Sequence, residues 1–158
     1  MKSPLASATW LELDEVESTQ TVAERLLKEG SEYGAVLAHH QTKGHGRFGR
    51  EWVSSRDESL TMSLIFRDYA DHPKPYLIGM TVAVAAAAAI HGLLQWPNDL
   101  ILGDRKVGGL LTEMMVDAQG RRIAVVGVGI TLNQKASPAE IADLATSVRL
   151  YHGGQYEP

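Results

Sequence analysis

The clearest pattern of apolar and polar positions lies at residues 60–66. Its apolar side chains stand at every second position: Leu60, Met62, Leu64 and Phe66. A period of two predicts a β-strand with one face against a core. Shorter apolar or alternating stretches predict further strands at residues 10–13, 35–38, 93–96, 100–102, 106–116 and 123–128.

Three stretches carry helix signals. Residues 17–30 place apolar side chains at helical spacing after a potential capping hydroxyl at Ser18, and a glycine stands where that helix should end. Residues 76–91 are rich in alanine and apolar nearly all round, which predicts a helix packed closely on a sheet. The capping signals of residues 137–140 predict a short third helix that runs through Val148.

Turn signals at residues 103–104 and 117–120 join the later strands into two hairpins, and successive hairpins form an antiparallel meander. We therefore predict an α+β fold in which the helices pack on one face of a mixed, mostly antiparallel sheet. A chain of 158 residues suits one domain with a core of its own. The expected organisation is a single domain over residues 1–158.

Composition narrows the class of protein. A net charge of −4 argues against general nucleic-acid binding, which normally leaves a basic excess. Cysteine is absent, which excludes disulfides, thiolate metal sites and a cysteine nucleophile and agrees with a reducing compartment. The longest apolar run, residues 82–90, is too short to span a bilayer. We therefore expect a cytoplasmic protein that binds neither nucleic acid nor membrane.

Candidate chemistry begins in the segment from Gln41 to Trp52, which reads QTKGHGRFGREW. Its three glycines allow the backbone to approach a ligand closely, and cationic or titratable side chains surround them. These side chains are Lys43, His45, Arg47 and Arg50. The composition is typical of an anion-binding loop, but a solvated surface turn has the same composition.

Polar residues and glycines interrupt three later strands. Asn98 and Asp99 follow a proline at a strand end, where they could also be plain turn formers. Lys106 stands just before Gly108 and Gly109, and strand glycines mark a bulge or the close approach of a ligand. Residues 127–133 repeat this kind of interruption. Together, the glycines, cations and acid suit an anionic, nucleotide-like reactant with Mg²⁺.

Taken in order, these segments resemble the catalytic domain of biotin protein ligases, which attach biotin to a lysine of a carrier protein. Residues 41–52 are similar to that family's GRGRxGRxW signature. The segments WPND at 96–99, KVGGLLTE at 106–113 and GVGI at 127–130 follow in the family's order, and residues 17–20 are similar to its entry to the first helix. The resemblance implies a biotin/lipoate ligase catalytic-domain fold, which is similar to that of class II aminoacyl-tRNA synthetases.

The resemblance also implies a two-step reaction. Biotin and MgATP form biotinyl-5′-AMP and pyrophosphate, and a lysine of the biotin carboxyl carrier protein then displaces AMP. The implied ligands are biotin, ATP and Mg²⁺, and the implied partners are the carrier protein and, in some members, a second copy of the chain. The N-terminal DNA-binding domain and the C-terminal β-barrel domain of longer members are expected to be absent.

By matched position, the resemblance assigns catalysis to Lys106 and Arg47 and the metal to Asp99. Lys106 would meet both the biotin carboxylate and the α-phosphate. The residues that it implies for binding biotin or the nucleotide are Ser18, Thr19, Gln20, Gln41, Gly44, His45, Gly46, Arg47, Arg50, Trp52, Asn98, Lys106, Gly108, Gly109 and Asn133.

Four departures from the family pattern keep other functions open. His45 stands in place of an arginine, Gln95 in place of a lysine and Thr131 in place of an asparagine, and the connection over residues 90–95 is short. These departures favour a non-catalytic relative that binds biotin or a nucleotide. A lipoate or other acyl-protein ligase would share the fold, but the loop at 41–52 matches the biotin branch. An active biotin protein ligase remains the expected function.

Overall fold

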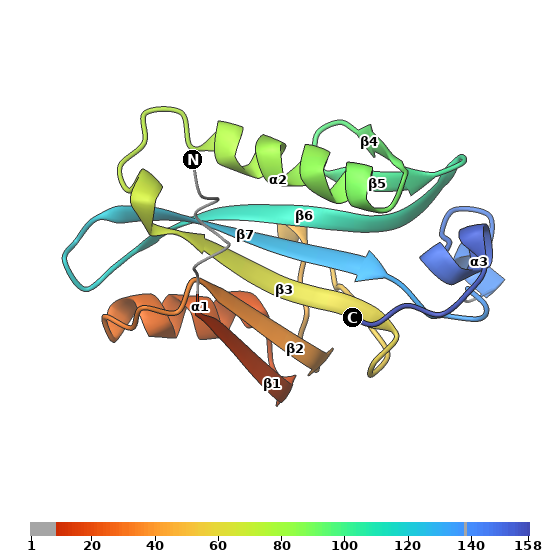
Figure 1. Ribbon diagram of the computed structural model, residues 1–158, viewed down its shortest axis with the longest axis horizontal. Coiled ribbons are helices and arrows are strands. Elements are labelled where there is room, and N and C mark those ends of the chain that lie inside the picture. Colours follow the sequence, from red (N-terminus) through yellow and green to blue (C-terminus); the bar gives the residue numbers. More distant parts are fainter. Residues whose placement is uncertain (1–8, 138) are drawn as a thin grey trace.

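The computed structural model describes residues 9–137 and 139–158, in which seven strands form one sheet (Figure 1). The strands are β1 (Trp10–Val16), β2 (Ala35–Gln41), β3 (Ser59–Phe66), β4 (Leu93–Gln95), β5 (Asp99–Leu102), β6 (Arg105–Val116) and β7 (Arg122–Thr131). The helices are α1 (Thr19–Lys28), α2 (Tyr76–Ala89) and α3 (Val148–His152), with 3₁₀ turns η2 (Arg47–Gly49), η3 (Arg67–Tyr69) and η4 (Ala139–Ile141).

The strand order is β1-β2-β3-β7-β6-β5-β4. Among the strand pairs of the described residues, only β1–β2 is parallel, so the predicted mixed, mostly antiparallel sheet is confirmed. In the long β6–β7 ladder Gly109 lies opposite Gly129 and Leu111 opposite Gly127. The pairing of β5 with β6 ends at Gly109, so within the described structure β6 from residue 110 onward pairs only with β7.

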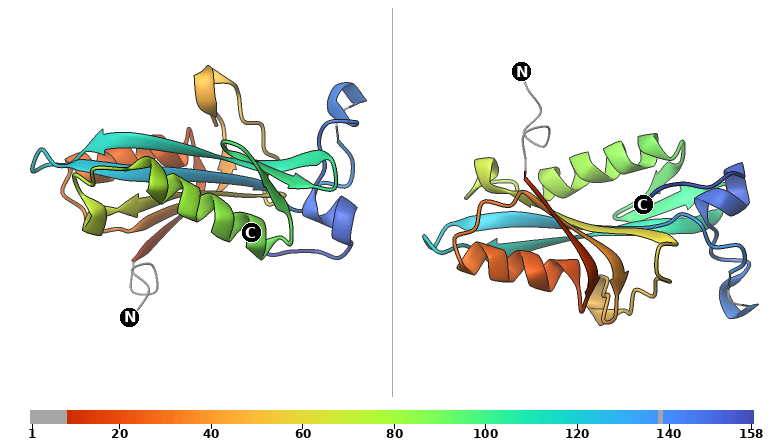
Figure 2. Two further views of the ribbon diagram at one scale, coloured as in Figure 1. Left: turned by 90° about the horizontal axis from the view of Figure 1, so that it is seen from above. Right: turned by 60° about the horizontal axis from the view of Figure 1, so that its bottom comes forward.

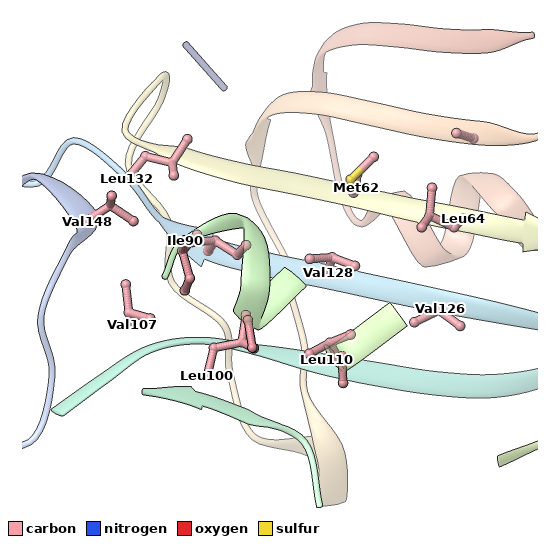
Figure 3. Close-up of a cluster of buried hydrophobic side chains, with 14 of the residues drawn as sticks. Met62, Leu64, Ile90, Leu100, Val107, Leu110, Val126, Val128, Leu132 and Val148 are labelled. Atoms are coloured by element: carbon pink, nitrogen blue, oxygen red, sulfur yellow. The ribbon is translucent and has the colours of Figure 1, made fainter. Parts of the chain in front are cut away.

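The prediction that the helices share one face of the sheet is wrong. Successive side chains of a strand point to opposite faces. On β7, Val126 and Val128 belong to the core beneath α2 (Figure 3), whereas Ile123 and Val125 belong to a second core beneath α1. The two long helices therefore cover opposite faces, as Figure 2 shows. The sequence could not reveal this, because β7 is apolar on both faces and has no alternation.

Helix α1 begins where the sequence predicts. Ser18 is extended, and its hydroxyl accepts a hydrogen bond from the Gln20 backbone N–H at 3.3 Å, which satisfies one free amide of the first turn. The apolar face of α1 then packs on the sheet, with Ala23 and Leu27 almost fully buried. The first turn of α1 therefore lies where the helix begins to cover the sheet. Its side chains stand beside the part of that sheet face that α1 does not cover.

The predicted third helix is wrong in extent. Pro138, which contributed to the capping signal, lies outside the described residues. Ser137 donates its hydroxyl hydrogen bond to the Ala145 carbonyl at 3.0 Å rather than capping a helix. A 3₁₀ turn at Ala139–Ile141 is followed by the separate helix α3, whose N-cap is Ser147. The sequence signal predicted one helix ending at Val148, whereas the chain forms a 3₁₀ turn and then a separate helix that begins at Val148.

A charged cluster ties β1 and β2 to the segment before β3. The two ring nitrogens of His39 lie 2.8 Å from carboxylate oxygens of Glu12 and Asp57. The hydrogen bond to Glu12, with a further contribution from Asp57, raises the pKa of His39 above its usual 6.5. Both ring nitrogens can donate to these carboxylates only while the imidazole carries its second proton, so the folded state is stabilised most when His39 is charged.

We therefore expect the free energy of unfolding to decrease as the pH rises above 6.5 and through the raised pKa of His39. The contribution is complete below pH 6.5, where the histidine is protonated in both folded and unfolded chains. Urea unfolding of the wild type and of His39→Gln across this pH range measures it. The variant should lose this part of the pH dependence, whereas His91→Gln, at an exposed position, should keep it. Equal pH profiles for wild type and His39→Gln would contradict the assignment.

Candidate active site

The glycine-rich loop leaves β2 at Gln41 and projects from the sheet on the face that carries α1 (Figure 2). It is closed by backbone hydrogen bonds from Gly46 N–H to the Arg50 carbonyl at 2.7 Å and from Trp52 N–H to the Gly44 carbonyl at 2.9 Å. A Cβ at Gly44 would lie 2.6 Å from the Trp52 carbonyl oxygen, so only glycine fits there. The loop therefore has a defined shape built from its own backbone.

Two glycines of β7 form the floor on which side chains of the loop and of α1 rest. A Cβ at Gly129 would lie 2.7 Å from the Trp52 indole, and one at Gly127 would lie 3.3 Å from the Gln20 side chain. The missing side chains therefore leave room for Trp52 and Gln20 directly against the strand. Between loop, helix and strands lies a cleft of about 320 Å³.

Most of the residues that the sequence singled out line this cleft. They are Ser18, Thr19, Gln20, Gln41, His45, Gly46, Arg47, Arg50, Trp52, Asn98, Asp99, Lys106 and Gly109. Gly44 and Gly108 do not line it: the first shapes the loop from within, and the second packs against the backbone of β7. These positions come from four distant parts of the chain and meet at one place.

Asn133 is also outside the cleft. Its side-chain amide donates to the Tyr156 carbonyl at 2.7 Å, and its side-chain oxygen accepts from the Tyr156 N–H at 2.9 Å. Both groups are thus used to hold the C-terminal segment. The assignment of Asn133 to ligand binding is not supported by this position.

Sequence reasoning gave no site role to several other residues that line the cleft: Phe48, Glu51, Met62, Pro97, Leu110 and Leu111. Gly127, Val128 and Gly129 also line it, in the strand interruption that the sequence analysis noted. Nothing in the sequence distinguishes Met62 or Leu111 from ordinary core residues. Leu111 lies opposite Gly127, on the face that no helix covers at that point, whereas Met62 also belongs to the core beneath α2.

The end of the cleft nearest α1 is neutral and polar. The Thr19 N–H and hydroxyl donate to the Gln41 side-chain oxygen at 2.7 and 3.1 Å, and Ser63 donates to the Thr19 hydroxyl at 2.8 Å. This use of its oxygen leaves the Gln41 amide N–H groups available. Two other buried atoms have no hydrogen-bond partner among the described residues, namely Gln20 Oε1 and Trp52 Nε1. A ligand at this end can therefore find both an acceptor and donors.

The opposite end carries the charges. Lys106 Nζ lies 2.8 Å from Asp99 Oδ1, and Arg47 donates to Asn98 Oδ1 at 3.0 Å. Arg50 lines the same cleft. A guanidinium and an ammonium beside open space are suited to carboxylate and phosphate oxygens. The resulting cleft is cationic at one end and neutral at the other.

Asp99 fits the role of a Mg²⁺ ligand in one respect. Within residues 9–137 and 139–158, no group of three His, Cys, Asp or Glu side chains could hold an ion by itself. Mg²⁺ with a nucleotide is usually held by one or two carboxylates together with phosphate oxygens. Asp99 supplies one such carboxylate, which is paired with Lys106.

Comparison with known proteins shows which protein family the chain belongs to. Residues 12–133 match the model of the biotin/lipoate A/B protein ligase family. The bifunctional ligase/repressor BirA of Bacillus spizizenii is 36% identical over 144 residues, which cover 85% of this chain and 44% of the relative. The biotin–[acetyl-CoA-carboxylase] ligase of Mycobacterium tuberculosis is 29% identical over 160 residues, covering 90% of this chain and 57% of the relative.

A solved structure of a biotin protein ligase agrees with this family assignment. The biotin protein ligase from Aquifex aeolicus in complex with biotin and ATP is 34% identical, with a TM-score of 0.73 over 94% of this chain and 63% of that one. The fold is that of a biotin/lipoate ligase catalytic domain, and the chain belongs to the biotin/lipoate A/B protein ligase family. It spans less than two thirds of the length of these relatives.

No helix in the described part of the chain has both the length and the apolarity needed to cross a membrane.

Proposed function

We propose that this domain is a biotin protein ligase, which joins biotin to AMP and then transfers biotin to a lysine of a carrier protein. The observation that supports this proposal most directly is the polarity of the cleft. Its cationic end, with Lys106 and Arg50, suits a carboxylate next to a phosphate. Its neutral end offers the Gln20 oxygen and the Gln41 amide, which match the N–H and C=O groups of a cyclic urea.

In the first step, a biotin carboxylate oxygen attacks the α-phosphorus of ATP and pyrophosphate leaves. Both reactants are anions that repel one another. Lys106 can lie between them and stabilise the charge that develops at phosphorus, and Arg47 and Arg50 can hold phosphate oxygens. Asp99 would then exchange its Lys106 partner for Mg²⁺, which neutralises phosphate charge when bound.

In the second step, the ε-amine of the acceptor lysine attacks the biotinyl carbonyl, AMP leaves and the amine loses a proton. The acceptor must reach the cleft from outside the domain. A second hollow, lined by Tyr76, Met80 and Trp96, adjoins the cleft through Arg47 and Asn98. The edge of β6 that β5 does not cover lies beside it. We propose that the biotin carboxyl carrier protein, in the cytoplasm, docks on this side of the domain. We also propose that a homodimer would form through the same uncovered edge of β6.

Mass spectrometry for biotinyl-5′-AMP after incubation with biotin and MgATP tests the proposed activity. The expected result is an adenylate that depends on both substrates and on Mg²⁺, with lipoate in place of biotin giving little product. Binding of biotin without adenylate would instead identify a non-catalytic relative. An adenylate formed only with lipoate would identify a lipoate ligase.

A further inference from the structure

Glu113 lies on β6, two residues beyond Leu111, and does not itself line the ligand cleft. Its Oε2 accepts a hydrogen bond from Gln20 Nε2 at 2.8 Å. Gln20 and Leu111 line the cleft, whereas Glu113 lines the second hollow on the other side of them. Glu113 is therefore placed beside the cleft rather than in it, and its hydrogen bond to Gln20 connects it to the cleft.

The hydrogen bond decides which way the Gln20 amide faces. An ionised carboxylate can only accept hydrogen bonds, so the NH₂ group of Gln20 must point toward Glu113. The side-chain oxygen then points the other way, above Gly127, where a Cβ would lie 3.4 Å from it. The reversed amide would bring two acceptor oxygens together and would present NH₂ to the cleft.

The Gln20 oxygen is poised for a ligand rather than for the protein. Gln20 is 4% exposed, and its Oε1 is fully buried with no hydrogen-bond partner among the described residues. Burial of an unpaired acceptor is costly, so a ligand N–H that reaches it gains a hydrogen bond with little competition from bulk water. His45 Nε2 is 4.0 Å from Glu113 Oε2, beyond hydrogen-bond range, and leaves Gln20 as the hydrogen-bonding partner of that oxygen.

We propose that Glu113 is a positioning residue that sets substrate specificity. By fixing the Gln20 amide, it makes the neutral end of the cleft an acceptor for ring N–H groups, as in a cyclic urea, and a poor match for rings that have none. This inference rests on the proposed biotin ligase function. It adds a role for a carboxylate that touches neither the substrate nor the reacting atoms.

The kinetics of adenylate formation by Glu113→Ala and Glu113→Gln test the proposal. The KM for biotin should rise about tenfold in Glu113→Ala, as expected when a buried polar group loses the partner that orients it. The kcat and the KM for ATP should stay within about twofold, since ground-state and transition-state binding of the biotin ring are lost equally. Glu113→Gln keeps the shape of the side chain and should show a smaller rise, because a neutral amide permits both orientations of Gln20.

A compensating exchange separates positioning from packing. In the double variant Gln20→Glu with Glu113→Gln, the new amide can donate to the new carboxylate, and the carboxylate's other oxygen again faces the cleft. Its KM for biotin should return to within about threefold of the wild-type value and should lie below that of Gln20→Glu alone. Glu24→Ala, which removes a half-exposed carboxylate of α1 whose partner is Lys28 rather than Gln20, serves as the matched control and should behave as wild type.

The outcomes are distinguishable. Wild-type protein that forms no biotinyl adenylate would overturn the proposed function itself. An active wild type with an unchanged KM for biotin in both Glu113 variants would overturn only the positioning role. Equal increases in the KM for biotin and for ATP would also overturn it, because they would indicate a general disturbance. If Glu113→Ala does not fold, the KM for biotin of Glu113→Gln and of the exchange variant decides whether Glu113 has a positioning role.

Discussion

Replacing Lys106 with alanine is expected to slow the formation of biotinyl-5′-AMP at least ~10²-fold, the scale seen when one positioned electrostatic donor is lost. Lys106 is the ammonium group at the charged end of the cleft, and it pairs with Asp99 at 2.8 Å. Without it, the cleft lacks the ammonium group that would lie between the carboxylate and the phosphate and offset their repulsion. Single-turnover adenylate formation with biotin and MgATP measures the effect.

Stability should change little in this variant. The side chains of Lys106 and Asp99 are 42% and 34% exposed, and ion pairs with such access to water contribute no more than about 1 kcal/mol. Thermal unfolding should therefore resemble that of Lys74→Ala, which removes an exposed lysine outside the cleft. Unchanged adenylation in folded Lys106→Ala would remove this lysine from the mechanism. Loss of folding would show that its role is structural.

Gly108→Ala is expected to destabilise the fold by about 1–3 kcal/mol, the usual cost of overpacking a filled interior. A Cβ at this position would lie 2.5 Å from the Gly129 carbonyl oxygen and 3.2 Å from Ile130 Cα. Both contacts are backbone atoms of the paired strand, so the ladder itself must shift. For a domain of this size, each kcal/mol lowers the melting temperature by about 2–4 °C, which calorimetry can resolve.

The next residue along β6 provides the matched control. A Cβ at Gly109 would meet its nearest neighbour, the Asn98 carbonyl oxygen, at 3.4 Å, which is an ordinary contact. Gly109→Ala should therefore unfold within about 0.5 kcal/mol of the wild type, although it adds a methyl group to the cleft. If both substitutions lower the melting temperature equally, the close approach of the β6 and β7 backbones is not the reason that glycine stands at 108.

The sequence predicted most strands because their apolar positions depend on local physics. Residues 60–66 alternate, and the observed strand is Ser59–Phe66. The residues of the cleft were predicted from local motifs. One is a cationic loop with three glycines, and another is a lysine that precedes two glycines. Glycines in such motifs allow an anion to approach the backbone closely. These signals are local in the chain, and the sheet brings them to one place.

What the sequence could not supply depends on long-range packing. The faces covered by α1 and α2 follow from strand order, which no local pattern encodes. The position of Asn133 beside the C-terminal segment depends on Tyr156, a contact made across the fold. The hydrogen bond between Gln20 and Glu113 joins residues 93 positions apart, and neither residue carries a motif that indicates the other.

The place of β7 in the sheet has a consequence for how the chain acquires its structure. β7 is inserted between β3 and β6, so residues 67–121 separate β3 from its partner. Pairings so distant in sequence form slowly, because a long loop must close before any contact compensates for its lost entropy. During synthesis, β1, β2 and β3 emerge first. The edge of β3 that pairs with β7 stays unpaired until the β6–β7 hairpin has been made. The final central ladder therefore closes only after most of the domain has been made.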